Sequence, residues 1–375
     1  MNIVLLKNNL KDGISIISGA RREVSNLPIL KNFLLEVRDD KLFISSTDLE
    51  IGVTHIINAK ILKEGSVAIP FNVFSQIINN LSFERITLES KNNSLFITTD
   101  NYKANVTTSN KSEFPIIPKI KEKGVNCFVF DTEYLVQALL SVVSSCQISN
   151  IRPELSGVLF SYISNEFKIV ATDSFRLAEK TINNKKITTE YDGDISFIVP
   201  LKTIQEVVRI FTLNNQKEEK IKIYFDKNQI LFETEKVSLI SRLIEGKFPD
   251  YEPLIPYSFE TEAILEKDDL ISALKLTSSL SNRLNEIKFI IDESLKNIKI
   301  HSLSQEFGES EYILSSKIKG NIQEIAFNWR YLLDGLKNIK TANVSFGFNG
   351  ENKPSLIKSP EDASLLYILM PIKSN

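Results

Sequence analysis

The sequence predicts an α+β protein made of three repeats, each with antiparallel strands and two helices packed on one face of the sheet. Two observations predict this class: a pattern of helix, strands, helix and strands occurs three times, and strand-like segments outnumber helix-like ones. The length of 375 residues suits two or three domains. Hydrophobic residues make up 42% and charged residues 25%, which is typical of a soluble globular protein.

The strand signal in each repeat is a pair of apolar segments joined by a short turn. The three pairs span residues 29–37 and 41–48, 154–160 and 167–173, and 286–291 and 297–302. Thr47-Asp48 ends the first pair and recurs as Thr172-Asp173 at the end of the second. The third pair lacks this dipeptide, and we align it by matching Ser302 with Thr172.

A helix-like stretch precedes each strand pair and a second one follows it, with apolar residues three and four positions apart. The first helices are expected at 10–18, 132–140 and 267–274, and the second helices at 71–78, 201–208 and 328–336. Pro70 and Pro200 stand directly before two of the second helices, where the fixed φ of proline suits a helix start.

Segments rich in proline and charge interrupt this pattern at residues 112–124 and 248–257. Such breaks are typical of short linkers between domains. We therefore expect three domains, at residues 1–123, 124–256 and 257–375.

Composition and motifs argue against several kinds of protein. Cys127 and Cys146 form no CxxC motif, so neither a zinc site nor a disulfide framework is expected. No apolar run reaches the ~18 residues of a membrane span, which predicts a cytoplasmic protein with no membrane contact. No glycine-rich phosphate loop is present, and we expect no cofactor.

An enzyme is the main alternative, as a metal-dependent nuclease or transferase that uses Asp48, Glu50, Asp100 and Asp173. Two-metal chemistry needs carboxylates that converge on one site. Asp48 and Asp173 occupy equivalent positions in different repeats, which argues against a shared metal. A structural role in turns after the strands explains them better, and we expect no catalytic activity.

Several short segments together resemble a known family. They lie at residues 27–32, 47–50, 114–115, 171–178, 248–251, 255–256 and 367–372. In this order they resemble the β subunit of bacterial DNA polymerase III, the sliding clamp, over all three repeats. The resemblance implies a non-catalytic homodimer closed head to tail into a ring, with helices lining a hole that encircles double-stranded DNA.

Such a ring binds DNA without reading its sequence and gives the replicative polymerase processivity by tethering it. The resemblance implies further partners that bind through short linear peptides: other DNA polymerases, the clamp loader and repair proteins. The net charge of −2 does not by itself indicate nucleic-acid binding, but a near-neutral chain can still carry one basic surface, and the resemblance implies that this surface is the helical lining. A scaffold of the same fold that binds no DNA is a further alternative, and it is distinguished by basic residues that face away from the hole.

The resemblance also assigns residues to three sites. The peptide cleft would comprise Leu155, Thr172, Ser174, Phe175, Arg176, Leu177, Pro249, Leu254, Ile368, Leu369, Met370, Pro371 and Ile372, with Arg176 at its polar rim. DNA would contact Arg21, Arg22, Asn150, Arg152 and Lys202, with either Arg21 or Arg22 replacing a family arginine whose position Val24 occupies. The subunit interface would join Phe74, Ile78, Lys103 and Val106 of one copy to Leu280, Glu306 and Glu309 of the other.

Two departures from the family pattern fall at the cleft. Ser174-Phe175 stands where many relatives carry Gly-His, and Pro253 stands where some carry a basic residue. We expect these residues to change how the cleft ranks its peptides.

Overall fold

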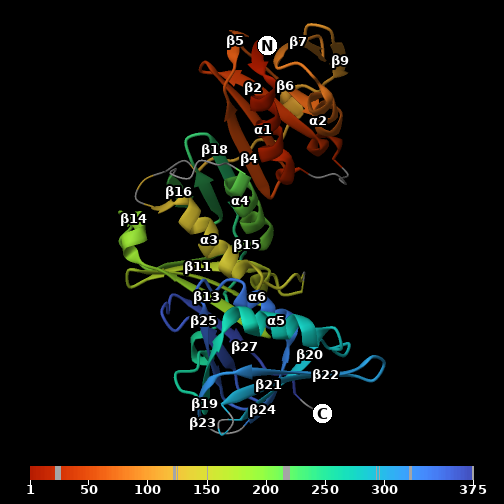
Figure 1. Cartoon of the computed structure of the whole chain (residues 1–375). Coiled ribbons are helices and arrows are strands. Elements are labelled where there is room, and N and C mark those ends of the chain that lie inside the picture. The colour runs from red at the N-terminus through yellow and green to blue at the C-terminus, as the bar shows by residue number, and fades with distance from the viewer. Residues whose placement is uncertain are drawn as a thin grey trace. The chain divides into compact units, whose positions relative to one another are not determined.

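The computed structural model describes residues 1–21, 27–120, 124, 126–149, 151–213, 220–292, 294, 296–320 and 323–373. Its strands pair antiparallel in four sheets and helices accompany them, so the α+β prediction is confirmed (Figure 1). The chain forms two compact units. Unit 1 comprises Met1–Val136, Ile187–Asp192 and Lys202–Leu243, and unit 2 comprises Gln137–Lys186, Gly193–Leu201 and Ile244–Asn375.

Four of the six predicted helices begin at the expected residue. The first helices of the repeats are α1 (Lys7–Ile17), α3 (Thr132–Val143) and α5 (Lys267–Ser278), and the second helices are α2 (Phe71–Asn80), α4 (Leu201–Leu213) and α6 (Trp329–Leu336). Of these, α1 begins three residues earlier than predicted and α6 begins one residue later. Pro70 and Pro200 directly precede α2 and α4, as predicted. Asn328 takes this position before α6, where its side-chain oxygen accepts a hydrogen bond of 3.0 Å from the Arg330 amide.

Unit 1 contains a five-stranded and a nine-stranded sheet. In spatial order the five-stranded sheet consists of β5 (Lys60–Lys63), β1 (Asn2–Leu6), β7 (Arg85–Lys91), β8 (Ser94–Thr98) and β9 (Lys103–Thr107). The nine-stranded sheet consists of β14 (Ile187–Thr189), β10 (Cys127–Asp131), β16 (Lys220–Phe225), β17 (Gln229–Glu233), β18 (Val237–Arg242), β4 (Ile51–Ile57), β3 (Lys41–Thr47), β2 (Asn32–Arg38) and β6 (Gly65–Pro70).

Unit 2 contains a second nine-stranded sheet and a four-stranded one. The nine-stranded sheet consists of β23 (Lys317–Gly320), β19 (Thr261–Glu266), β25 (Asn343–Phe348), β26 (Ser355–Lys358), β27 (Leu365–Leu369), β13 (Arg176–Ile182), β12 (Glu166–Thr172), β11 (Gly157–Ile163) and β15 (Ile195–Pro200). The four-stranded sheet consists of β22 (Gly308–Ser315), β21 (Asn297–Ser304), β20 (Glu286–Asp292) and β24 (Gln323–Asn328).

Each nine-stranded sheet combines strands of two successive repeats. β4 pairs with β18 in unit 1, and β13 pairs with β27 in unit 2. We call these pairings the first and second junctions. The sequence predicted one sheet layer for each repeat and did not reveal that the sheets continue into the next repeat. The pairing satisfies backbone N–H and C=O groups that would otherwise form an open edge.

The repeats match strand by strand, because the two nine-stranded sheets have the same order of equivalent strands. Isolated bridges recur at the same place in all three repeats: Ala68–Ser109, Ile198–Ile244 and Ala326–Ile372. The five-stranded sheet then corresponds to the β14 to β18 half of a nine-stranded sheet, and the four-stranded sheet corresponds to the β4 to β6 half. Within the described residues, β9 and β22 are therefore the two edge strands that stand where a third junction would form.

The helices cover the sheets through apolar faces at helical spacing. In α4, Ile204, Val207 and Phe211 are buried, and in α1 Leu10, Ile14 and Ile17 are buried. The two helices are also joined directly in unit 1, since the Arg209 guanidinium donates to the carbonyls of Ser15 and Ile16 at 2.8 and 2.7 Å. These carbonyls lie in the last turn of α1, where the Ser15 carbonyl also accepts from the amide and the hydroxyl of Ser18. In unit 2, Asn338 donates in the equivalent way to the Ser141 carbonyl of α3 at 3.3 Å.

The Thr-Asp dipeptides form the same turn in the first two repeats. Asp48 accepts from the Glu50 and Ile51 amides at 3.0 and 2.8 Å, and Asp173 accepts from the amides of the two equivalent residues, both at 2.9 Å. Leu49 and Ser174, the residues after each aspartate, both have φ near the left-handed region, at 79° and 77°. The predicted structural role of both aspartates is confirmed.

The alignment of the third repeat was wrong by one residue. The hydroxyl of Ser302 donates to the Thr277 carbonyl at 2.6 Å, just as the Ser46 hydroxyl donates to the Ile17 carbonyl at 2.5 Å. Ser302 therefore corresponds to Ser46, and not to Thr47 or to its equivalent in the second repeat, Thr172. The turn between β21 and β22 has its own sequence, which left no Thr-Asp pair to fix the alignment.

We predict that Asp48 stabilises the first junction through its turn and not through its ion pair. Its carboxylate is 3% exposed and contacts the ammonium of Lys202, whose side chain is 51% exposed. Asp48→Ala leaves the buried Ile51 amide and the part-buried Glu50 amide without their acceptor and should lower the free energy of unfolding by about 2–3 kcal/mol. Asp48→Asn keeps an acceptor and should cost about 0–1 kcal/mol. Urea denaturation measures both, and equal losses would contradict the prediction.

Candidate functional site

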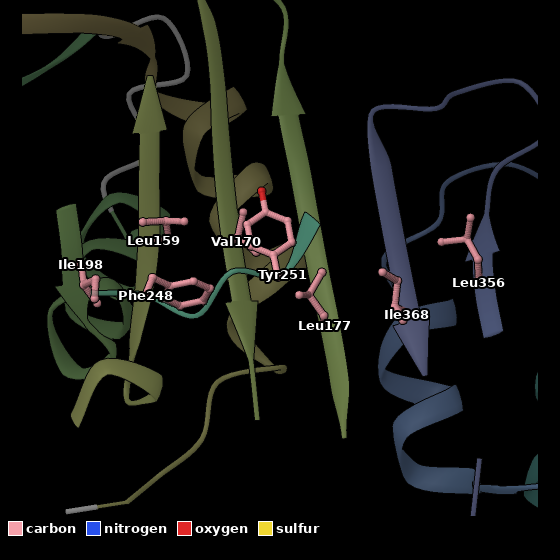
Figure 2. Close-up of a cluster of buried hydrophobic side chains, with 8 residues drawn as sticks. All are labelled: Leu159, Val170, Leu177, Ile198, Phe248, Tyr251, Leu356 and Ile368. Atoms are coloured by element: carbon pink, nitrogen blue, oxygen red, sulfur yellow. The ribbon is translucent and has the colours of Figure 1, made fainter. Parts of the chain in front are cut away.

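An apolar cluster covers the second junction on one face of the sheet (Figure 2). Its eight buried residues are Leu159, Val170, Leu177, Ile198, Phe248, Tyr251, Leu356 and Ile368. Leu177 of β13 lies opposite Ile368 of β27, so the cluster crosses from one repeat to the next. Phe248 and Tyr251 come from the connector between the repeats and pack on the sheet.

Exposed apolar side chains stand beside this buried floor. Phe175 is 62% exposed, Leu254 is 55% exposed and Met370 is 37% exposed. The Met370 amide donates to the Phe175 carbonyl at 2.9 Å, which holds these two residues together across the junction. The arrangement of a buried apolar floor with exposed apolar residues beside it suits the capture of a partner's apolar side chains. We call this surface the peptide cleft.

The residues that the sequence assigned to the peptide cleft fall into three groups. Thr172, Leu177 and Ile368 are buried on adjacent strands and form the floor. Ser174 and Phe175 are exposed, as are Leu254 and Met370, and Pro249, Pro371 and Ile372 are half-buried. Leu155 and Leu369 are buried but are not members of the apolar cluster.

Arg176 was expected at the polar rim, but its side chain is only 10% exposed. Its guanidinium binds Asp173 at 3.0 Å and Asp334 of α6 at 2.6 Å, and lies 4.2 Å from the centre of the Tyr331 ring. Arg176 therefore ties β13 to α6 and is not free to bind a ligand. Desolvation lowers the pKa of Arg176, but the phenol of Tyr367 and the two carboxylates more than offset it, so the pKa is raised above its ordinary value.

Glu179 and Lys168, which the sequence analysis did not single out, fix the position of Tyr251 in the peptide cleft. The Tyr251 hydroxyl donates to the Glu179 carboxylate at 2.6 Å, and the Lys168 ammonium lies 3.7 Å from the same carboxylate. Glu179 is 3% exposed. Burial and the hydrogen bond to Glu179 raise the pKa of Tyr251, so the phenol stays protonated and keeps its donor. The motif at 248–251 contains Tyr251, but a lone tyrosine in a motif does not identify its carboxylate partner.

The proposed DNA-contacting residues that the structure describes all have partners within the chain. The Arg21 guanidinium donates to Asn72 at 2.8 Å and stacks 4.4 Å from the centre of the Phe71 ring. Arg152 lies 3.4 Å from Glu154, with its side chain 52% exposed, and Lys202 contacts Asp48. Arg22 and Asn150 lie outside the described residues.

Helices α1 to α6 themselves carry almost no net charge. Across α1 to α6, basic and acidic side chains are nearly equal in number, and α2 carries neither. In α4, for example, Arg209 binds Glu206 at 2.7 Å. Arg21 follows α1, Arg152 precedes β11 and Lys202 lies in the first turn of α4.

The residues proposed for the subunit interface differ in exposure. Phe74 and Ile78 are fully buried and Val106 is 6% exposed, so the single chain already covers them. They face the core because they lie on the apolar side of α2 and on the inner side of β9. The remaining residues are more accessible: Lys103, Glu306 and Glu309 are exposed, and Leu280 is half-buried.

Among the described residues, no group of three or more His, Cys, Asp or Glu side chains converges to hold a metal ion. Within the same residues, no helix is long and apolar enough to cross a membrane.

Comparison with known proteins identifies the family of all three repeats. The family models of the DNA polymerase III beta subunit match residues 1–118 (N-terminal domain), 130–250 (central domain) and 252–373 (C-terminal domain). The chain belongs to the DNA polymerase III beta subunit family.

Relatives share the full length of the chain at modest identity. The beta sliding clamp of Bacillus subtilis is 26% identical, with both chains covered completely, and that of Chlamydia muridarum is 26% identical over 100% of this chain and 99% of the relative. Two crystal structures are similar over both whole chains: the DNA polymerase sliding clamp of Bacillus subtilis (TM-score 0.94, 26% identity) and the beta subunit of Thermotoga maritima (TM-score 0.89, 29% identity).

Membership in the beta subunit family settles the enzyme alternative. The family is the sliding clamp, a non-catalytic processivity subunit of DNA polymerase III. Asp48 and Asp173, which a nuclease or transferase would need as metal ligands, each serve the turn of their own repeat.

We predict that Arg176 is a structural tie in this beta subunit. Arg176→Ala leaves Asp173 without its cation and Asp334 with only the exposed Lys337 at 3.7 Å, and should lower the free energy of unfolding by about 2–4 kcal/mol. The matched control is Arg38→Ala, because Arg38 is 42% exposed and lies 3.8 Å from Glu36. Its loss should be about 0–1 kcal/mol. Urea denaturation compares the two, and an Arg176 variant as stable as the control would refute the tie.

Proposed function

We propose that the protein is a DNA sliding clamp that works as a closed homodimeric ring. The ring encircles double-stranded DNA without sequence preference and keeps the replicative polymerase at high effective concentration near the primer end. The family match over all three repeats supports this function most strongly. Bacterial replication takes place in the cytoplasm, and we propose that location for the protein.

Three clamp domains would build each subunit, at residues 1–123, 124–256 and 257–375. We propose that the peptide cleft at the second junction receives short segments of the replicative polymerase, other polymerases, the clamp loader and repair proteins. The exposed Phe175 and Met370 beside a buried floor support this role. Phe175 adds apolar area at a position where many relatives carry histidine, and so favours peptides with bulky apolar residues.

Ring closure would use one edge strand from each of the two smaller sheets. β9 occupies the position that β18 and β27 occupy at the junctions within the chain. β22 occupies the position of β4 and β13. Pairing β9 of one copy with β22 of another would form a third junction of the same kind, and two such pairings would close a dimer head to tail. Open, exposed edges are otherwise prone to uncontrolled association.

The internal equivalence also gives a register for this third junction. On the β22 side, three successive cross-strand pairings lead from Ala326 of β24 to Glu311 of β22. Three equivalent pairings lead from Ala68 of β6 to Thr54 of β4, so Glu311 is equivalent to Thr54. On the β9 side, two successive cross-strand pairings lead from the third residue of β7 to Lys103. Two equivalent pairings lead from the third residue of β16 to Ser238, so Lys103 is equivalent to Ser238.

Thr54 lies opposite Ser238 at the first junction, so Lys103 would lie opposite Glu311 of the second copy. Both side chains are exposed in the single chain. Opposite charges that face each other across antiparallel strands stabilise the pairing. This register replaces Glu306 and Glu309 as the acids facing Lys103. All three acids have a partner in the single chain: Glu306 lies 3.9 Å from Arg283, Glu309 lies 3.4 Å from His301 and Glu311 lies 3.1 Å from Lys299. The strand register alone therefore selects Glu311.

Topological binding predicts that the dimer, once loaded, stays on a nicked circular duplex and leaves when the circle is cut. A ring held by linkage slides off a free end, whereas a protein held by phosphate contacts stays equally on both forms. Gel filtration of DNA-bound protein before and after linearisation measures the difference. Equal retention would contradict encirclement. Raised salt should release protein from linear DNA more than from circles, because only charge contacts are screened.

The proposed register predicts a charge-swap rescue. Lys103→Glu places two acids opposite each other at both interfaces and should raise the dimer dissociation constant by about tenfold or more. Glu311→Lys should do the same. The double variant restores opposite charges and should regain most of the affinity, as measured by sedimentation equilibrium. Additive losses in the double variant would show that the two residues do not face each other.

A further inference from the structure

A second cavity lies beside the peptide cleft and is not part of it. Its volume is about 550 Å³, and it is lined by residues 253–260 together with Asn349, Lys353 and Pro354. Seven of its eleven lining residues are proline, aliphatic or aromatic, including three prolines, Leu254, Tyr257 and Phe259. We call it the connector cavity.

The walls of the connector cavity are fixed by bonds within the chain. Asn349 accepts from the Glu260 amide at 3.0 Å and donates to the Ser258 carbonyl at 3.1 Å. The Phe259 ring lies against the backbone of Gly347, where an added Cβ would come within 2.4 Å of the ring. A cavity whose walls are held in this way is formed before a ligand arrives, which reduces the entropy cost of binding.

The connector cavity continues the peptide cleft. Leu254 lines it and was also assigned to the cleft, and Ile255 and Phe259 pack against the apolar cluster that forms the cleft floor. A chain segment that leaves the cleft past Leu254 therefore enters an apolar surface and not open solvent. Tyr257, at 89% exposed, extends this surface further than any other lining side chain.

The charges at the cavity select for an uncharged occupant. Lys353 and Glu260 lie 3.2 Å apart and are 67% and 50% exposed. Because each offsets the other, they offer no net attraction to an acidic or a basic side chain. The apolar and proline lining instead suits an apolar residue or a proline in an extended segment.

We propose that the connector cavity binds an apolar residue or proline that flanks the segment held in the peptide cleft, so that partners carrying such a flank bind more tightly. The inference rests on the proposed function, because it extends the same peptide-binding surface. It makes Tyr257 a specificity-determining residue. Its exposure means that replacing it removes contact area without disturbing the core.

The test uses the shortest peptide of the cognate replicative polymerase that binds the dimer, found with an overlapping peptide array. This core peptide is extended at either end by Leu-Pro or, as the matched control, by Gly-Ser. Fluorescence anisotropy should give about fivefold tighter binding for Leu-Pro than for Gly-Ser at one of the two ends. Tyr257→Ala should abolish this difference and leave the affinity of the core peptide unchanged, whereas Tyr257→Phe should retain it.

Other outcomes separate the two proposals. Equal affinity of the Leu-Pro and Gly-Ser forms at both ends, or a difference that survives Tyr257→Ala, overturns the connector cavity and leaves the peptide cleft intact. Phe175→Ser should weaken the core peptide and both extended forms alike, since it changes the cleft and not the cavity. If no polymerase peptide binds, or if Phe175→Ser has no effect, the peptide cleft itself fails and the inference fails with it.

Discussion

An unpaired sheet edge is the constraint on which this molecule depends. Each repeat supplies a half-sheet whose outer strand must find a partner, and the next repeat supplies that partner at β4–β18 and at β13–β27. The same order of strands leaves β9 and β22 as the matching edges within the described chain. A closed ring is the arrangement in which every junction edge of such a repeat finds a partner strand, and so the homodimer we propose follows from backbone hydrogen bonding.

The two faces of a junction have different chemistry. On the helix side, charged side chains join successive repeats, as Arg176 does with Asp334 and Lys202 does with Asp48. On the other side of the second junction, a buried apolar cluster lies under exposed Phe175 and Met370. In the function we propose, the apolar face binds partners while the charged face keeps the repeats in register. Because the helices carry nearly balanced charge, the ring that we propose would contact DNA weakly through few cations, which suits sliding.

Local patterns in the sequence predicted the local structure. The helices, the turns of Asp48 and Asp173 and the floor residues Leu177 and Ile368 all follow from periodicity or from motifs that act within a few residues. Contacts between distant segments were not predictable in this way. The inward position of Arg176 could not be predicted, because its partner Asp334 lies far along the chain. The burial of Phe74 could not be predicted either, because an apolar helix face alone does not distinguish a core from an interface.

Amide hydrogen exchange of β9 and β22 tests the central claim most directly. If these strands form the third junction, their edge amides exchange slowly in the dimer and become fast when dilution yields monomers, while the β4–β18 and β13–β27 amides stay protected in both states. Protection of β9 and β22 that does not change with dissociation, or dimer-dependent protection confined to other strands, would contradict the account.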